Sequence, residues 1–429
     1  MDWPIGVTLM MALMFAGVPI AFAMAGVGLL GVASIIGWQP ALSLIGQTYF
    51  DGGRSYTLSI VPLFLLIGNL VVQSGIAGDL YTAANAWLRH RKGGLAMATI
   101  VACGGFSSVC GSSLATAATM ARISLPAMRR YGYSDRLAAS SVAAGGTLGI
   151  LIPPSIILVI YGILTQQHIG MLFLAGLLPG LVGVVGYIIA VRMSLVMYKE
   201  ENLQTQPKLP LGDRIAALKG VIWALLLFTF VLGGIYVGVF TATEAAGMGA
   251  GGALLLTFLR GRLTLRDTLA TLFDTAKTTA LMFFILFGAL YFLNYVNFSG
   301  LTSDLRSWVN ALGVGPYAVI LSIAVIYLVL GCLLESLSMI TLTVPILFPI
   351  VVGLGFDPIW FGIFVVVAAE LSYITPPIGM NIFVLRSVAP EIPIERIYVG
   401  IAPFVLVDIA RLLLLIAVPG IALLIPYSM

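Results

Sequence analysis

Two short clusters of small and polar residues interrupt otherwise apolar stretches of the sequence, at 104–113 and at 331–338. The first reads GGFSSVCGSS and the second reads GCLLESLS. Hydroxyls, together with backbone carbonyls released where a helix unwinds, are the oxygen ligands that a sodium ion takes in transport proteins. N–H groups at the start of a helix suit the carboxylate of an anionic substrate. The clusters therefore predict a site for a monovalent cation and an organic anion.

Two proline pairs, Pro153-Pro154 and Pro376-Pro377, mark a second kind of interruption. They lie in the apolar segments GILIPPS (149–155) and ITPPIGMN (374–381). Consecutive prolines remove two backbone donors and clash with the preceding turn, so a helix cannot continue through them. Each segment is expected to be a discontinuous helix whose freed carbonyls face the protein interior.

The clusters and breaks supply the candidate binding residues, and their glycines allow close backbone approach and positive φ. The candidate sodium-binding residues are Ser108, Gly111, Ser112, Ser113, Pro153, Ser155, Glu335, Ser336, Ser338, Thr375, Pro376, Gly379 and Asn381. The candidate substrate-binding residues are Ser112, Ser113, Thr116, Pro154, Ser338, Pro377 and Asn381. Small residues also pack membrane helices closely. The paired constellation of hydroxyls, carbonyls and glycines favours ligand sites.

Glu335 and Glu370 are acids within apolar surroundings. Glu335 lies in the second cluster, where a charged group is a candidate functional residue by default. It either binds a cation or a proton, or it caps the helix expected to start at Ser336. Glu370 precedes the second break and is expected beside the site.

Four further charged positions are assigned to structural roles. Asp408 and Arg411, three residues apart on the last predicted helix, are expected to pair. Glu244 is expected at a membrane boundary. Arg122 is expected to extend toward the cytoplasmic surface, with anion binding as the alternative.

The elements that must position these residues are membrane helices. Of the 429 residues 60% are hydrophobic and only 9% are charged, against about 25% charged in a soluble domain. Continuous apolar runs, rather than period-2 alternation, predict an all-α polytopic membrane protein and not a β-barrel. The predicted spans are 2–17, 20–38, 57–76, 136–163, 170–192, 219–239, 243–260, 278–297, 358–388 and 397–427.

The chain also contains an internal repeat. Pro126, Pro153 and Pro154 recur 223 residues later as Pro349, Pro376 and Pro377. The regions 94–130 and 315–353 are too short to cross the membrane twice, so each is expected to be a re-entrant helical hairpin. The predicted organisation is a first repeat at 1–198 (hairpin 94–130, broken helix 136–163), a cytoplasmic loop at 199–218, and a second repeat at 219–429 (hairpin 315–353, broken helix 358–388).

Flanking charges predict that the two repeats are inverted. One cation, Arg306, flanks the second hairpin, whereas six flank the first, namely Arg89, Arg91, Lys92, Arg129, Arg130 and Arg136. The positive-inside rule then places the base of the first hairpin in the cytoplasm and that of the second outside. The amphipathic segments 77–92 and 299–311 are expected to lie in the interface plane. Inverted repeats with broken helices are typical of secondary transporters.

Three motifs resemble the large membrane subunit of TRAP (tripartite ATP-independent periplasmic) transporters. They are CGSSLATAA at 110–118, GTLGILIPPS at 146–155 and ITPPIGMN at 374–381, and the resemblance covers essentially the whole chain. Glu335 is a departure, since Asp is more usual there in this pattern.

The resemblance implies an elevator-type carrier in the bacterial inner membrane. It implies sodium-driven uptake of a carboxylate such as a C4-dicarboxylate or a sialic acid, with Na⁺ as coupling ion and no cofactor. The implied partners are a small membrane subunit of about four helices on a separate chain, a periplasmic substrate-binding protein and membrane lipid, but no nucleic acid.

Three alternatives stay open. A stand-alone sodium/dicarboxylate symporter of related architecture would need no binding protein. An intramembrane protease would use Ser112 or Ser113 and needs a base within hydrogen-bond reach, yet the two histidines, His90 and His168, lie at predicted membrane edges. A channel would conduct ions continuously, although inverted broken helices suit alternating access better.

Overall fold

The computed structural model describes residues 1–200 and 203–428. Within these residues every regular element is a helix, which confirms the all-α prediction. The elements outside the two hairpins and broken helices are α1 (Trp3–Phe15), α2 (Ile20–Ile36), α3 (Trp38–Arg54), η1 (Tyr56–Ser59), α4 (Ile60–Ser74), α5 (Ile76–Leu88), α10 (Ile169–Met197), α11 (Leu211–Leu218), α12 (Ile222–Tyr236), α13 (Ala242–Leu259), α14 (Leu265–Phe298), α15 (Leu301–Ala311), α20 (Ile394–Ala417), α21 (Gly420–Leu423) and η3 (Pro426–Ser428).

The first hairpin consists of α6 (Gly94–Cys110) and α7 (Ser113–Arg130). The break between them is shorter than predicted, because residues 104–108 stay helical. The hydroxyls of Ser107 and Ser108 bond to carbonyls of their own helix, at 2.7 Å each. The turn is made by Gly111, whose φ of 66° lies in the left-handed region, and by Ser112, which caps α7.

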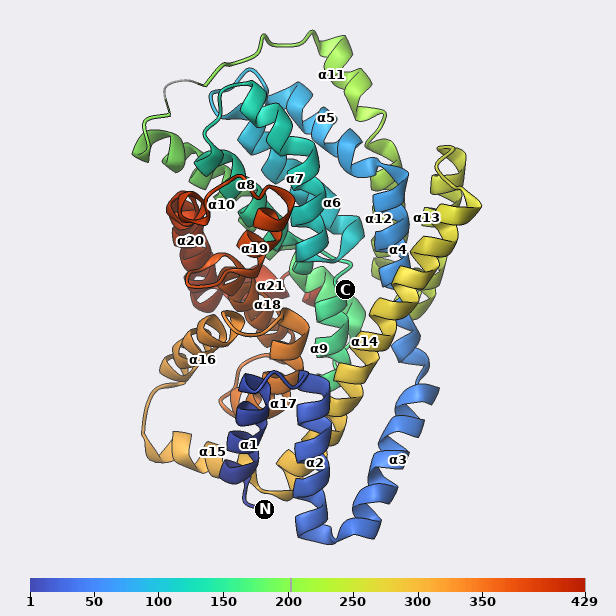
Figure 1. Cartoon of the computed structure of the whole chain (residues 1–429), viewed down its shortest axis with the longest axis vertical. Coiled ribbons are helices and arrows are strands. Elements are labelled where there is room, and N and C mark those ends of the chain that lie inside the picture. The colour runs from blue at the N-terminus through green and yellow to red at the C-terminus, as the bar shows by residue number, and fades with distance from the viewer. Residues whose placement is uncertain (201–202, 429) are drawn as a thin grey trace.

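The second hairpin consists of α16 (Pro316–Gly331) and α17 (Ser336–Gly353). Its tip is the four-residue segment 332–335, inside the predicted break. The two hairpins lie in opposite halves of the molecule, the first in the upper half of Figure 1 and the second in the lower half. Their tips point to the same central region, as expected for inverted repeats.

Both predicted broken helices are present. The first is α8 (Asp135–Thr147) and η2 (Leu148–Ile150), followed after Pro153-Pro154 by α9 (Ile156–Thr165). The second is α18 (Pro358–Ile374), followed after Pro376-Pro377 by α19 (Met380–Val388). The Pro-Pro bond is cis in both. Each break leaves several residues outside the helical hydrogen-bond ladder, so their carbonyls are free to accept other partners.

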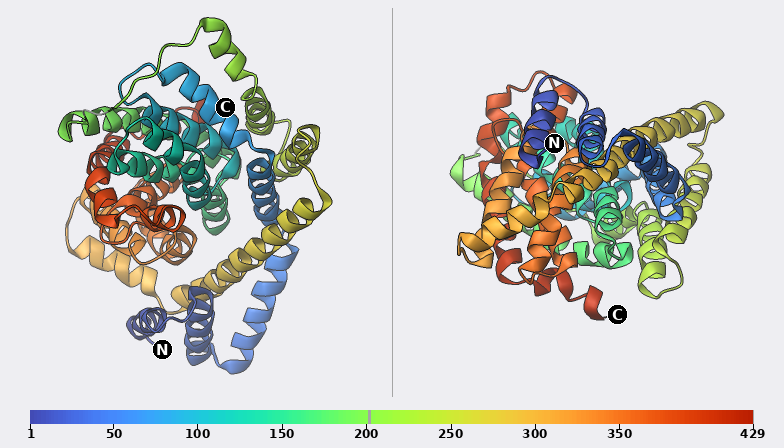
Figure 2. Two further views of the ribbon diagram at one scale, coloured as in Figure 1. Left: turned by 45° about the horizontal axis from the view of Figure 1, so that its top comes forward. Right: turned by 90° about the horizontal axis from the view of Figure 1, so that it is seen from below.

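A second group of helices stands beside the hairpins. The long helix α14 packs against α2 and α4, and α4 packs against α13. Figure 2 shows α14 running diagonally across the molecule, with α3 beside it at one edge. We refer to α2, α4, α13 and α14 as the scaffold.

The interface segments predicted at 77–92 and 299–311 correspond to α5 and α15.

Three helical regions are absent from the predictions. These are α3, the first part of α14 before residue 278, and α11, which occupies the end of the connection predicted as a loop at 199–218. All three contain charged residues among apolar ones, so an apolar-run criterion does not detect them.

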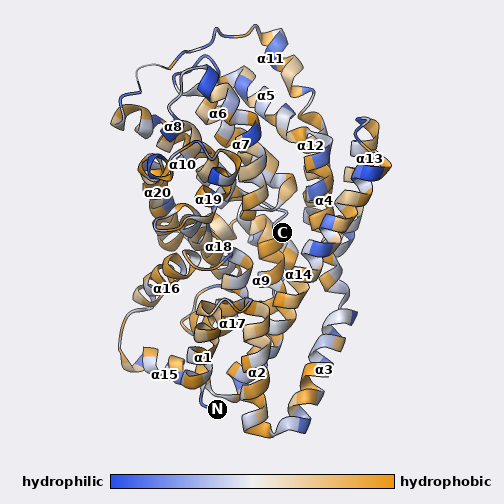
Figure 3. Ribbon diagram, in the orientation of Figure 1, coloured by the Kyte–Doolittle hydropathy of each residue, from blue (hydrophilic) through white to orange (hydrophobic). Residues whose placement is uncertain are grey.

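The apolar surface agrees with a membrane location. Among the described residues six helices are long and apolar enough to cross a membrane, and the bent pair of α11 and α12 brings the number to seven. Other predicted spans are shorter, because hairpin tips and Pro-Pro breaks divide them. Figure 3 shows hydrophobic ribbon through the middle of the molecule and hydrophilic segments near α5, α11 and the end of α13. Large side chains such as Leu225 and Phe273 are exposed, as lipid-facing residues should be.

Candidate functional site

A cavity of about 300 Å³ lies where the two hairpin tips meet, and we call it the central cavity. The first tip contributes Gly111, Ser112 and Ser113, and the second contributes Glu335 and Ser336. Residues 225 or so apart in the sequence therefore line one space, as the repeat predicts. Ile150 and Ile156, on either side of the first Pro-Pro pair, add an apolar part of the wall.

The opposite wall of the central cavity belongs to the scaffold. It includes Gly68 and Asn69 of α4 with Thr278 and Met282 of α14. The Asn69 side chain donates to the Thr275 hydroxyl at 2.9 Å, which orients its amide. The sequence predictions do not include these residues, because a single Asn or Thr within an apolar helix carries no local signal.

The first tip packs tightly on the first break. A Cβ on Gly111 would lie 2.7 Å from the Pro154 carbonyl oxygen, and one on Gly149 would lie 2.6 Å from the Ser112 carbonyl oxygen. Glycine is needed at both places because any side chain would collide with backbone. Two carbonyl oxygens therefore come close to the tip. The Ser112 oxygen already accepts from the N–H and the hydroxyl of Thr116, so the Pro154 oxygen is the better candidate ligand for a cation.

A hydrogen bond joins the first hairpin to the second broken helix. The Ser113 hydroxyl donates to the side-chain oxygen of Asn381 at 2.9 Å, and the Asn381 amide donates to the Ala143 carbonyl at 2.9 Å. Both side chains are buried. Asn381 thus lies at the first hairpin, although the sequence places it next to the second break.

The second tip is held by Tyr373, whose hydroxyl accepts a hydrogen bond from the Ser336 backbone N–H. Glu335 occupies the N-cap position of α17, but its carboxylate makes no capping hydrogen bond. The capping alternative for Glu335 is therefore wrong for this structure, and the carboxylate faces the central cavity instead.

Several candidate residues lie outside the lining of the central cavity. Four of them use their hydroxyls to bond to backbone carbonyls of nearby residues. Ser108 bonds to Gly105, Thr116 to Ser112, Ser155 to Ile150 and Thr375 to Leu371. Ser338 is buried in α17, and Gly379 starts α19 with a φ of 63°.

The proline candidates are placed differently in the two breaks. Pro153 and Pro154 are buried, whereas Pro376 and Pro377 are exposed in this chain. The Pro377 carbonyl accepts from the Tyr398 hydroxyl at 2.6 Å. The sequence symmetry therefore does not extend to equal enclosure of the two breaks.

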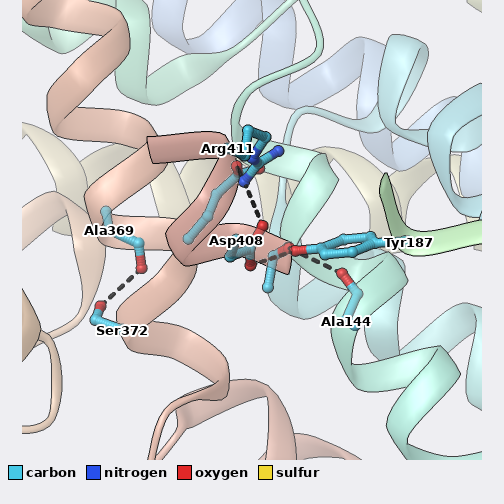
Figure 4. A network of polar contacts seen from close by, with 8 residues as sticks. Ala144, Tyr187, Ala369, Ser372, Asp408 and Arg411 are labelled. Atoms are coloured by element: carbon cyan, nitrogen blue, oxygen red, sulfur yellow. Dashed lines mark hydrogen bonds and ion pairs between the residues drawn. The ribbon is translucent and has the colours of Figure 1, made fainter. Parts of the chain in front are cut away.

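A second polar site, which we call the Arg411 network, shares no residue with the lining of the central cavity. Figure 4 shows Arg411, Asp408 and Tyr187 of this network. The predicted pair of Asp408 and Arg411 is confirmed, with 2.9 Å between the carboxylate oxygen and Nη2. Glu370 of α18 also accepts from Nη2, at 2.5 Å, which the sequence did not predict. The Tyr187 hydroxyl donates to Asp408 at 2.6 Å and lies 2.8 Å from the Thr147 hydroxyl.

The remaining predicted polar residues have structural positions. Glu244 forms a capping box with Thr241 at the start of α13, and His168 caps α10. Arg122 is exposed on α7 and makes no ion pair in the described part of the chain. Neither histidine lines the central cavity, so the protease geometry is missing there. Among residues 1–200 and 203–428 no cluster of three His, Cys, Asp or Glu residues could hold a metal ion.

Comparisons with known proteins agree with this architecture. Residues 7–421 match the family described as "Tripartite ATP-independent periplasmic transporter, DctM component". The chain is 36% identical over 401 residues to the C4-dicarboxylate TRAP transporter large permease protein DctM of Pseudomonas aeruginosa, covering 93% of each chain. It is 33% identical to the sialic acid TRAP transporter large permease protein SiaM of Vibrio cholerae, covering 97% of this chain and 96% of that protein.

A solved structure shares the fold. The YdaH transporter of Alcanivorax borkumensis aligns with a TM-score of 0.63 over 90% of this chain and 89% of that one, at 15% identity. The family match over almost the whole length, together with the relatives above 30% identity, settles the assignment. The chain belongs to the DctM component family of tripartite ATP-independent periplasmic transporters, and it is an integral inner-membrane transport protein rather than an enzyme.

Proposed function

We propose that this chain takes up a small organic acid, such as a C4-dicarboxylate or a sialic acid, driven by sodium ions. The substrate is delivered by a periplasmic binding protein, and the chain works with a separate small membrane subunit of about four helices. The observation that carries this proposal is the central cavity, where two half-helix ends and one carboxylate converge on a space large enough for a small acid. The names of the relatives support both the tripartite organisation and the substrate class.

The proposed cation sites are the two hairpin-and-break pairs. We define the first pair as the α6–α7 hairpin with the break at 148–155, and the second pair as the α16–α17 hairpin with the break at 375–379. At the first pair the Pro154 carbonyl is the candidate ligand. At the second pair the candidates are Glu335 and carbonyls freed by the break. The substrate carboxylate would bind the N–H groups at Ser112–Ser113, where the helix dipole favours negative charge.

An elevator movement is the proposed mechanism. One wall of the central cavity comes from the tips and the other from α4 and α14 of the scaffold. If the hairpins and broken helices move as one body past the scaffold, substrate travels with the tips while the scaffold wall changes. The binding site lies at the boundary where the scaffold helices α4 and α14 pack on the hairpin helices α6 and α17, and this position supports the mechanism.

Uptake into proteoliposomes tests the coupling and the substrate. This chain and its small subunit would be reconstituted and supplied with labelled C4-dicarboxylates and sialic acid, with and without an inward Na⁺ gradient and the binding protein. Uptake that requires both Na⁺ and the binding protein is the expected result. Uptake that requires Na⁺ alone would favour a stand-alone symporter, and uptake with neither would refute the proposal.

Cross-linking tests the elevator movement. Asn69→Cys on the scaffold and Ser112→Cys on the tip line the same cavity, and the native Cys103, Cys110 and Cys332 are first replaced by Ala. Joining the two thiols with a short bifunctional reagent should stop uptake until the link is cleaved. Each single-Cys variant, given the same reagent, should transport as fast as it does without the reagent. Continued uptake by the linked protein would show that the tips do not move past the scaffold.

A further inference from the structure

The Arg411 network is a buried charge cluster that the proposed transport cycle does not use. Glu370 and Asp408 are 0% exposed, and the Arg411 side chain is 3% exposed. The network joins α20 to α18 through Glu370, and to α10 and α8 through Tyr187 and Thr147. It therefore connects both broken helices through residues that do not line the central cavity.

The charges of this cluster do not balance. Two carboxylates would carry two negative charges, and Arg411 supplies one positive charge. A guanidinium remains protonated in proteins under all ordinary conditions. An unpaired charge is strongly unfavourable in a dry interior, so burial favours the binding of one further positive charge by this cluster.

Other groups around Glu370 do not supply that charge. The Tyr187 hydroxyl faces Asp408, and the Arg411 guanidinium lies 5.8 Å from the Tyr187 ring centre. The helices α9 and α16, which also pack on α18, carry Tyr161 and Tyr327, whose hydroxyls bond to the Pro358 carbonyl and to Thr343. On α17 the nearest acid is Glu335 at the hairpin tip, and on α19 Arg386 is exposed.

The geometry selects Glu370 as the residue that is neutralised. Asp408 has one oxygen accepting from Tyr187 and the other 2.9 Å from Nη2 of Arg411, in an ion pair without a hydrogen bond, and both contacts favour the ionised form. Glu370 has only one oxygen engaged, by Nη2 of Arg411, while its buried Oε1 has no hydrogen-bond partner. Placing a proton on Oε1 leaves the bond to Arg411 intact.

A metal cation fits this place poorly. Both acids contact the same nitrogen, Nη2 of Arg411, so a metal ion between them would lie against the guanidinium. A hard cation also needs several oxygen ligands, and no three acidic, His or Cys side chains are grouped for a metal in the described residues. A proton needs no such ligand shell.

We propose that the Arg411 network is a proton-binding site, with one proton held on Glu370 as a neutral carboxylic acid throughout transport. The proton neutralises the cluster and lets α18 pack on α20 without an unpaired charge. The proton would bind at a place separate from the proposed sodium sites, so this proposal holds even if Na⁺ coupling is refuted.

Infrared absorption spectroscopy on the purified complex with its small subunit tests the proposal directly. The wild-type protein at neutral pH should show the carbonyl band of a protonated carboxylic acid from within the membrane, shifted by ¹³C-glutamate labelling and unaffected by ¹³C-aspartate. The band should vanish in Glu370→Gln and persist in Glu335→Gln. Absence of the band in wild type, its shift with labelled aspartate, or its loss in Glu335→Gln would each overturn the proposal.

Transport measurements give an independent readout. Gln is an isostere of the protonated acid, so Glu370→Gln should retain uptake within about twofold at neutral pH. Wild-type uptake should decline at alkaline pH, where Glu370 loses its proton, and Glu370→Gln should not show this decline. Asp408→Asn leaves Glu370 as the one carboxylate beside Arg411, so Glu370 should ionise and the band of the protonated acid should be lost from this variant. An inactive but folded Glu370→Gln variant would mean that the ionised carboxylate is required. If Glu370→Gln fails to fold, the labelled wild-type and Glu335→Gln spectra still decide the question.

Discussion

The two hairpin-and-break pairs follow one sequence plan, but the structure encloses them differently. In the first pair the tip is buried, and the Pro154 and Ser112 carbonyls press on Gly111 and Gly149. In the second pair Leu333 of the tip is 53% exposed and the Pro-Pro residues face outward. The first pair offers neutral oxygens in a fixed arrangement, whereas the second offers a carboxylate, Glu335, on a looser frame. Internal symmetry thus predicts where a site lies, but not how rigid or how charged it is.

The largest expected effect comes from adding a methyl group at the first tip. Gly111→Ala keeps a residue with a side chain in the left-handed backbone region, which costs about 1–2 kcal/mol. The new Cβ would also lie 2.7 Å from the Pro154 carbonyl oxygen. We expect Na⁺-driven uptake to fall by more than about tenfold. The measurement is uptake per folded transporter, with folding checked by size-exclusion chromatography in detergent.

Two glycines with similar backbone angles sharpen this test. Gly313, with a φ of 62°, has no neighbour within 4 Å, so Gly313→Ala measures the backbone strain alone. At the second break, Gly379→Ala would meet the flexible end of Ile382 at 3.0 Å and should reduce uptake less than Gly111→Ala. Equal losses at Gly111 and Gly379 would show that the two pairs are equally rigid.

The next effect tests the charge that distinguishes the second pair. Glu335→Gln removes the carboxylate from the central cavity and should raise the Na⁺ concentration for half-maximal uptake by about tenfold, because a nearby opposite charge is worth a few kcal/mol. Glu335→Asp keeps the charge and should lie between wild type and Glu335→Gln. The control is Glu395→Gln, since Glu395 is an exposed residue of the first turn of α20. An unchanged Na⁺ dependence in Glu335→Gln would show that Glu335 is not part of the cation site.

The part of the site that was predictable from sequence depends on residues that are close together in the chain. Glycine, serine and proline determine where a membrane helix must break, so both hairpins and both broken helices were foreseen from 94–130, 136–163, 315–353 and 358–388. What was missed depends on packing between distant helices. Asn69 and Thr278 become cavity residues only because α4 and α14 lie against the tips, and Glu370 meets Arg411 only because α18 packs on α20.

A smaller effect is expected where the two pairs touch inside the membrane. Ser113→Ala removes the hydroxyl that donates to Asn381 and should weaken Na⁺-driven uptake a few-fold, since such a bond contributes about 1 kcal/mol. Ser124→Ala is the matched control, because Ser124 is also buried on α7 but bonds to the Met120 carbonyl of its own helix at 2.8 Å. Equal behaviour of the two variants would mean that the link to Asn381 does not couple the pairs.

The smallest effect is expected at the exposed contact between the pairs. Arg129, at the base of the first hairpin, contacts Asp135 at 2.8 Å and also Glu391, which follows the second broken helix. A hydrogen bond from its own backbone N–H and the Arg129 charge hold the pKa of Glu391 below its usual value. The ion pair is therefore complete at neutral pH and is lost as the pH falls through this lowered pKa.

Arg129→Gln should accordingly change uptake by less than about twofold at neutral pH. The difference from wild type should shrink further at acid pH, or when choline chloride raises the ionic strength without changing the Na⁺ gradient. Uptake measured over pH and ionic strength checks both trends. A large, salt-independent loss would mean that the two pairs are joined at this surface as firmly as through Ser113 and Asn381, and the contrast between a rigid first pair and a looser second pair would no longer hold.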